Sequence, residues 1–177
     1  MNNFVFVALL AVFVYFMLMK SSFEIESGIF IYQKPATVYK AISSMDIIER
    51  FQPYVVSTKR IHSEKSADGI LTEYHTIEEH VPTVFNFTLP IIFDTKMEFT
   101  EPNSILNFHY SVWYGTVKGH VTWGVKPRSG HRGAGSYLSY HARISCPWVT
   151  KSFTEASAKE AQNTILTRMR IAMEKLD

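Results

Sequence analysis

The chain has 177 residues, of which 46% are hydrophobic, 14% aromatic and 19% charged, and its formal net charge is +2. This length suits one folded domain with an appendage, and the apolar content excludes a disordered chain. The sequence has no long basic run, which argues against nucleic-acid binding. The single cysteine, Cys146, excludes an internal disulfide and a zinc site built on cysteine pairs.

The N-terminal segment is strongly hydrophobic, because residues 4–19 carry no charged side chain. We predict that residues 1–22 form a hydrophobic anchor, a single-pass signal-anchor helix held in a membrane through residues 4–19. Such a helix would extend ~24 Å at about 1.5 Å per residue, which suits a thin membrane such as the endoplasmic reticulum. Lys20 and Lys34 follow the segment and no Lys or Arg precedes it, which favours a cytosolic domain. The alternative is a signal peptide that is cleaved, followed by secretion, but the segment lacks a positively charged start.

The next elements are a strand and two short helices. Ile29 to Tyr32 are β-branched or aromatic and follow a glycine, so they predict a strand. Pro35 suits a first helical position, and apolar residues then fall at helical spacing as far as about Ser44. A second helical pattern begins in "SSMDIIERF" and ends before Pro53.

A succession of strands fills the middle of the chain. The apolar and β-branched runs, with their separating turns, predict six or seven antiparallel strands between Val55 and Cys146 together with the opening strand. We expect an interruption at Pro90, between "VFNFTL" and "FDTKMEF".

The C-terminal segment predicts one long amphipathic helix. Ser152 and Glu155 have the spacing of a capping box, and no helix breaker follows as far as Leu176. Apolar residues recur every three or four positions, which gives one continuous stripe along about 24 residues, or roughly 36 Å.

This order of elements resembles the START-like superfamily, the helix-grip fold of lipid-transfer domains, polyketide cyclase/dehydrase proteins and the major pollen allergens. The resemblance covers residues 23–177 and rests on the element order, on "IYQKPATVYKAIS" and on "ERFQPYVVSTKRI". It implies an α+β domain: a curved antiparallel sheet, two short helices after the first strand, and a long C-terminal helix across the sheet. In full, we expect an anchor in residues 1–22 and a ligand-binding domain in residues 23–177.

The predicted interior of this domain is apolar and incompletely filled. Small residues in the first half of the last helix, Ala158 and Ala161 among them, cannot fill the concave side of a curved sheet. Alternate residues of the strands place large rings on the same side. The predicted ligand-binding residues are Phe93, Met97, Phe99, Phe108, Tyr110, Trp123, Tyr140, Ala158, Ala161, Ile165 and Met169. The same side chains could instead pack into a solid core.

The functional prediction is a membrane-tethered domain that binds or transfers a hydrophobic small molecule. The resemblance implies the ligand class: a sterol, a phospholipid, a fatty acyl chain or a quinone. A cyclase/dehydrase-type enzyme using the same cavity is the alternative, but the predicted inward set contains only phenols as titratable groups. A scaffold with a filled core, recognised through its surface, is the third hypothesis.

No catalytic residue, metal ligand or cofactor is predicted. Glu79 and His80 are adjacent in a strand, so their side chains point to opposite faces and cannot act together on one substrate. His109, His120 and His141 are expected on the outer face of neighbouring strands, away from any cavity. Cys146 lies in no pattern that would activate a thiol.

Overall fold

The computed structural model describes residues 2–82, 87–101, 104–130 and 133–175. The helices are α1 (Asn2–Leu18), α2 (Pro35–Ile42), α3 (Met45–Phe51) and α4 (Lys151–Glu174), with a short 3-10 turn η1 (Trp148–Thr150) before α4. The strands are β1 (Lys20–Ile31), β2 (Val55–Lys65), β3 (Leu71–Pro82), β4 (Thr88–Glu101), β5 (Ile105–Val112), β6 (Val117–Gly130) and β7 (Gly133–Pro147).

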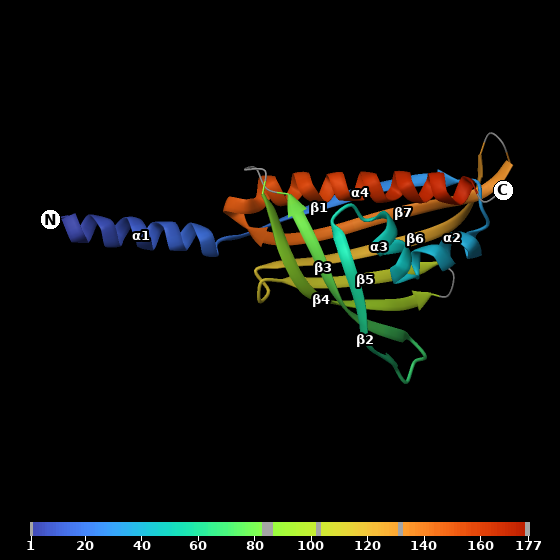
Figure 1. The fold of residues 1–177 in the computed structure, drawn as a ribbon, viewed down its shortest axis with the longest axis horizontal. Coiled ribbons are helices and arrows are strands. Elements are labelled where there is room, and N and C mark those ends of the chain that lie inside the picture. Colours follow the sequence, from blue (N-terminus) through green and yellow to red (C-terminus); the bar gives the residue numbers. More distant parts are fainter. Residues whose placement is uncertain (1, 83–86, 102–103, 131–132, 176–177) are drawn as a thin grey trace.

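The seven strands form one antiparallel sheet in the order β1-β7-β6-β5-β4-β3-β2. Strands β2 to β7 follow one another as neighbours, and β1 closes the far edge by pairing with β7 from Lys20↔Pro147 to Ile31↔Ser136. The sheet curves, and α4 runs along its concave side, as Figure 1 shows. The predicted α+β helix-grip architecture, with two short helices after the first strand, is confirmed.

Strand β4 runs without a break through Pro90, contrary to the predicted interruption. Pro90 pairs with His80 of β3, whereas the register with β5 begins only at Asp94. One side of β4 is therefore unpaired at Pro90, and a proline at such an edge position costs no ladder hydrogen bond. Residues 84–86 of the predicted "VFNFTL" strand lie outside the part of the chain that the structure describes.

The solid core occupies one end of the concave side. The second half of α4 buries Leu166, Met169 and Met173 there, and α2 adds Val38 and Ile42. The core cluster joins these side chains to the inward residues of the sheet. Two hydrogen bonds tie this end together, from Gln33 Nε2 to the Met173 carbonyl (3.2 Å) and from Arg168 to the Phe51 carbonyl (3.3 Å).

The hydrophobic N-terminal segment forms helix α1, which projects from the domain (Figure 1). Its apolar side chains are exposed, with Phe6 at 68% and Leu9 at 64%. Among the described residues, no helix combines the length and the apolar character needed to cross a membrane. Helix α1 gives way almost at once to β1, where the Trp148 amide donates a 2.8 Å hydrogen bond to the Met19 carbonyl.

Candidate functional site

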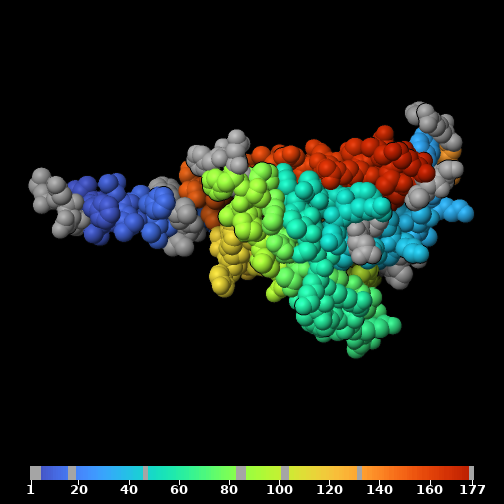
Figure 2. Space-filling model, viewed as in Figure 1, coloured from blue at the N-terminus to red at the C-terminus, as the bar shows by residue number. Residues whose placement is uncertain are grey.

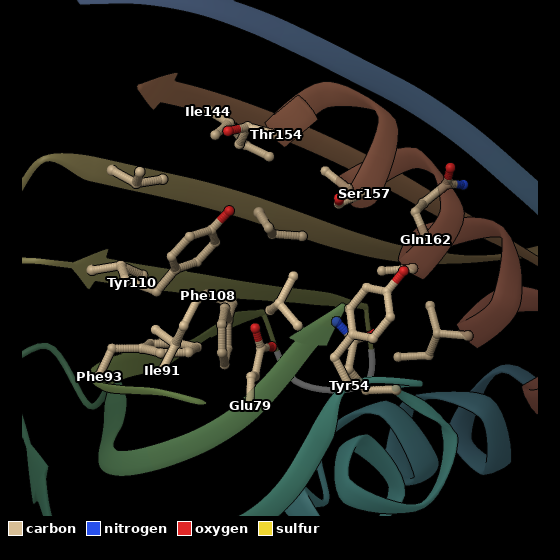
Figure 3. A pocket seen from close by; sticks show the side chains of 18 of the residues that line it. Tyr54, Glu79, Ile91, Phe93, Phe108, Tyr110, Ile144, Thr154, Ser157 and Gln162 are labelled. Carbon is tan, nitrogen blue, oxygen red and sulfur yellow. The ribbon is translucent and has the colours of Figure 1, made fainter. Parts of the chain in front are cut away.

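A cavity of about 220 Å³ lies between the sheet and the first half of α4. It is larger than the apolar cavity of roughly 150 Å³ that suffices to bind benzene. Figure 3 shows side chains from β3, β4, β5 and α4 converging on this space. The wall is formed by Ile48, Gln52, Tyr54, Glu79, Val81, Ile91, Phe93, Leu106, Phe108, Tyr110, Val112, Trp113, Val117, Val121, Trp123, Tyr140, Ile144, Phe153, Thr154, Ser157, Ala158, Ala161, Gln162 and Ile165.

Eight of the eleven predicted ligand-binding residues line this cavity. They are the ring-bearing residues Phe93, Phe108, Tyr110, Trp123 and Tyr140 of the sheet, and Ala158, Ala161 and Ile165 of α4.

The other three predicted residues do not reach the cavity. Met97 and Met169 are almost fully buried in the core cluster, and Phe99 packs against that cluster. Alternation along a strand gives the face on which a side chain lies, but it does not give the distance along the sheet at which α2 and α3 begin to fill the concave side. The cavity is therefore confined to the half of the domain beside the start of α4.

The wall combines small residues on α4 with large rings on the sheet. Trp123 and Tyr140, on neighbouring strands, meet edge to face with ring centroids 4.8 Å apart. The ring centroid of Tyr110 lies 5.9 Å from that of Phe93 and 6.2 Å from that of Phe108.

A glycine makes room for the Tyr110 ring. Tyr110 of β5 pairs with Gly119 of β6, and a Cβ atom at position 119 would overlap the tyrosine ring. The missing side chain therefore leaves the space that this ring occupies against the sheet.

The mouth of the cavity lies at the end of the domain from which α1 emerges. Trp113, in the β5–β6 turn, and Phe153, in the first turn of α4, both line the cavity while remaining 48% and 42% exposed. Trp113 and Tyr114 adopt positive φ angles of 49° and 53°, which non-glycine residues seldom adopt. Figure 1 places η1 and this turn at the α1 end of the domain, and Figure 2 shows the same end from the outside.

Glu79 is the one charged residue among the described residues of the cavity wall, and the sequence prediction missed it. It lies on β3 between Val55 of β2 and Ile91 of β4. The register of β2 shifts between Val55 and Ser57, opposite Glu79 and Glu78, and such bulges redirect side chains. The expectation that the interior holds only phenols as titratable groups is therefore wrong.

Burial determines the protonation of Glu79. Desolvation raises the pKa of this carboxyl from its ordinary 4.5 to about 7, and a hydrogen bond from Gln52 opposes the rise. His80, its neighbour in sequence, points to the outer face and contacts Glu78 at 3.2 Å. The prediction that Glu79 and His80 point apart is confirmed.

Several further polar residues line the cavity, and the sequence prediction included neither Tyr54 nor Gln162 among them. Tyr54 follows α3 and forms a hydrogen bond with Glu160 of α4, so it links the two sides of the cavity. Burial and that contact raise the pKa of Tyr54 to about 12. Gln162 of α4 is 4% exposed, and its Nε2 atom has no hydrogen-bond partner in the described structure.

The histidines of the outer face do not converge on one point. His109 and His120 stack with ring centroids 4.3 Å apart, whereas His141 lies 3.7 Å from carboxylate oxygens of Glu24 and Glu26. Within the described residues, Glu24, Glu26 and His141 are the one group with three ligand atoms mutually within 4.8 Å. Glu24 is already paired with Arg143 at 2.6 Å, and the group lies outside the cavity.

Comparisons with known proteins identify the fold. No protein-family model and no curated protein sequence matches the chain. Solved structures do match: a START superfamily protein from Mycobacterium smegmatis has a TM-score of 0.65 at 10% identity, covering 87% of this chain and 99% of that one. The Zhui aromatase/cyclase from a Streptomyces species has a TM-score of 0.64 at 9% identity, covering 88% of this chain and 95% of that one. A protein from Thermus thermophilus has a TM-score of 0.62 at 12% identity, covering 87% of this chain and 99% of that one.

These matches identify the chain as a protein with the START-like fold, and the predicted resemblance is confirmed. At such low identity they establish the fold alone.

Proposed function

We propose that this protein binds a hydrophobic small molecule in the cavity between the sheet and α4. The observation that carries the proposal is the cavity of about 220 Å³, bounded mainly by aromatic and aliphatic side chains and by a helix face that carries small residues. Such a wall, with a few polar groups among apolar ones, is the usual composition of a small-molecule site.

The chemistry of the wall supports the hydrophobic ligand class that the resemblance implies. Apolar side chains surround this space, so the part of a sterol, quinone or lipid chain that enters it would be desolvated. At about 25 cal/mol per Å² of buried apolar surface, even a modest ligand would gain several kcal/mol.

Membrane attachment through α1 is the second part of the proposal. The exposed apolar side chains of this helix favour insertion into a bilayer. Helix α1 adjoins the end of the domain where Trp113 and Phe153 flank the cavity mouth. Attachment would therefore keep the mouth close to hydrophobic ligands dissolved in the bilayer and raise their effective concentration. In this arrangement the domain lies on the cytosolic side, as the lysines after α1 favour.

A cyclase/dehydrase-type enzyme is the second candidate, and Glu79 is the observation that favours it. A carboxyl with a pKa of about 7 inside an apolar cavity can take up or release a proton near neutral pH. In a dehydration, its carboxylate would remove the proton α to a carbonyl and then return that proton to the β-hydroxyl, which leaves as water as the Cα–Cβ double bond forms. A β-hydroxy carbonyl probe should then lose the mass of one water on incubation with the protein, and Glu79→Gln should abolish the loss.

Native mass spectrometry tests the binding proposal. The full-length chain, purified under gentle conditions from its expression host, should carry an additional mass that organic extraction identifies as a hydrophobic compound. A bare protein mass that stays unchanged after incubation with lipid vesicles would contradict ligand binding. An extracted compound that is turned over, with a product of altered mass, would favour the enzyme.

A further inference from the structure

The cavity wall has an unbalanced charge. Glu79 is its one acidic residue, and no Lys, Arg or His is among the described residues that line it. The hydrogen bond to Glu79 comes from Gln52, a neutral amide that carries no counter-charge. A carboxylate in an apolar site is costly without a cation, so this side chain lacks the partner that its charged form requires.

The aromatic rings of the wall also favour a positively charged ligand. Tyr110 has the rings of Phe93 and Phe108 as neighbours, at 5.9 Å and 6.2 Å between centroids, and the faces of aromatic rings attract cations. Figure 3 shows Glu79, Phe108 and Tyr110 directed toward the same space. An anionic ligand would meet a like charge and ring faces, whereas a cation would meet an opposite charge and the same faces.

The phenols near Glu79 stay neutral at neutral pH, because burial raises their pKa values further above this range. From the α3–β2 segment and from β5, the phenols of Tyr54 and Tyr110 face this carboxyl, and burial raises the pKa of both. On β7, burial also raises the pKa of Tyr140. On α4, Glu160 contacts Tyr54 and is not one of the residues that line the cavity. The wall therefore changes its charge in this range through Glu79.

We infer that the cavity selects apolar molecules that carry a basic nitrogen, with the ammonium group paired to the Glu79 carboxylate, over neutral or acidic molecules of the same shape. This inference rests on the proposed binding function and adds the chemical class of the ligand's polar group. The apolar body of the ligand lies among the rings of the sheet and the alanines of α4. Gln52 orients the carboxylate toward the incoming ammonium.

A matched set of probes tests the selectivity. Naphthalene carrying an aminomethyl, a hydroxymethyl or a carboxyl group offers one rigid apolar body with a cationic, neutral or anionic polar group. Dissociation constants are measured on the full-length chain in a nonionic detergent at about pH 8, where Glu79 is ionised. Because a hydrogen bond to a charged group contributes about 1.5–3 kcal/mol, the amine should bind about tenfold or more tightly than the alcohol. The acid should bind most weakly.

Two variants and one change of pH locate the effect. Glu79→Gln should bind the amine no better than the alcohol, whereas the neighbouring Glu78→Gln, on the outer face, should keep the full preference. For each probe, the dissociation constant of the wild type is divided by that of Glu79→Gln. Partition of the probe into detergent affects both constants equally and cancels in this ratio. At about pH 5, where Glu79 is protonated, the wild-type preference should also disappear.

Equal binding of amine and alcohol to the wild type, or a preference that survives in Glu79→Gln, would overturn the inference and leave the proposed binding function standing. Failure of all three probes, and of extracted host lipids, to bind would instead overturn the proposed function itself.

Discussion

Replacing Glu79 by glutamine should change how stability depends on pH. In the unfolded chain this carboxyl has its ordinary pKa of 4.5, and in the folded chain burial raises it to about 7. Between these values the folded state binds more protons than the unfolded state, so stability falls as pH rises. Glu79 therefore costs nothing below the lower pKa, and its full cost is present above the higher one.

The size of the effect follows from the difference between the two pKa values. Each pKa unit corresponds to about 1.4 kcal/mol, so about 3 kcal/mol of stability should be lost between roughly pH 4 and 8. Glu79→Gln lacks this loss, and other titrating groups cancel when the two proteins are compared. The variant should therefore gain up to about 3 kcal/mol on the wild type as pH rises through this range.

Urea unfolding of the full-length proteins at a series of pH values, in one nonionic detergent, measures this difference. Glu78→Gln provides the control, because Glu78 is solvent-accessible and contacts Ser57 (3.1 Å) and His80 (3.2 Å) on the outer face. Its difference from the wild type should vary little with pH. A difference between the wild type and Glu79→Gln that stays constant from pH 5 to 8 would refute the argument that burial perturbs this carboxyl.

Further substitutions test the other parts of the site. Ala161→Phe should fill the cavity and abolish the ligand mass seen by native mass spectrometry, whereas Ala156→Phe, on the exposed side of the same helix, should retain it. Tyr54→Phe removes the hydrogen bond to α4 and should lower the free energy of unfolding by about 1 kcal/mol, as urea titration would show. Gly119→Ala should displace the Tyr110 ring, costing about 1–3 kcal/mol and altering the near-UV circular dichroism. The full-length chain should float with phosphatidylcholine vesicles, and a double variant with glutamate at the exposed positions of Leu9 and Phe13 should not; equal flotation of the two would contradict attachment through α1.

The fold could be predicted because each local pattern agrees with the tertiary arrangement. Pro35 begins α2 as expected, and the apolar stripe of the C-terminal segment becomes the buried side of α4. The start of α4 could not be placed as well. The predicted capping box at Ser152 does not form, since the helix begins at Lys151 directly after η1, where the Thr150 hydroxyl bonds to the Pro147 carbonyl.

Prediction of the site was limited by information that no local pattern contains. Alternation indicates which side of the sheet a side chain lies on, but the depth to which α2 and α3 fill the concave side is a tertiary property. It could therefore not show that Met97 and Met169 lie in the core cluster and not on the cavity wall. Glu79 could have been found, because it alternates with Ile77 and Val81 in "IEEHV", both on the concave side. Tyr54 lies in an irregular segment after α3, where no periodicity indicates its direction.

The position of Glu79 argues that the cavity is more than a packing defect. A glutamine at this place would keep a hydrogen bond with Gln52 and avoid burying a charge. The carboxyl instead costs about 3 kcal/mol near neutral pH, a large share of the stability of a typical domain. Residues that break a local rule in this way, without a counter-charge in the protein, tend to occur at functional sites. A carboxyl without a counter-charge, facing an apolar space with aromatic walls, is therefore better explained by a cationic ligand than by the packing of the domain.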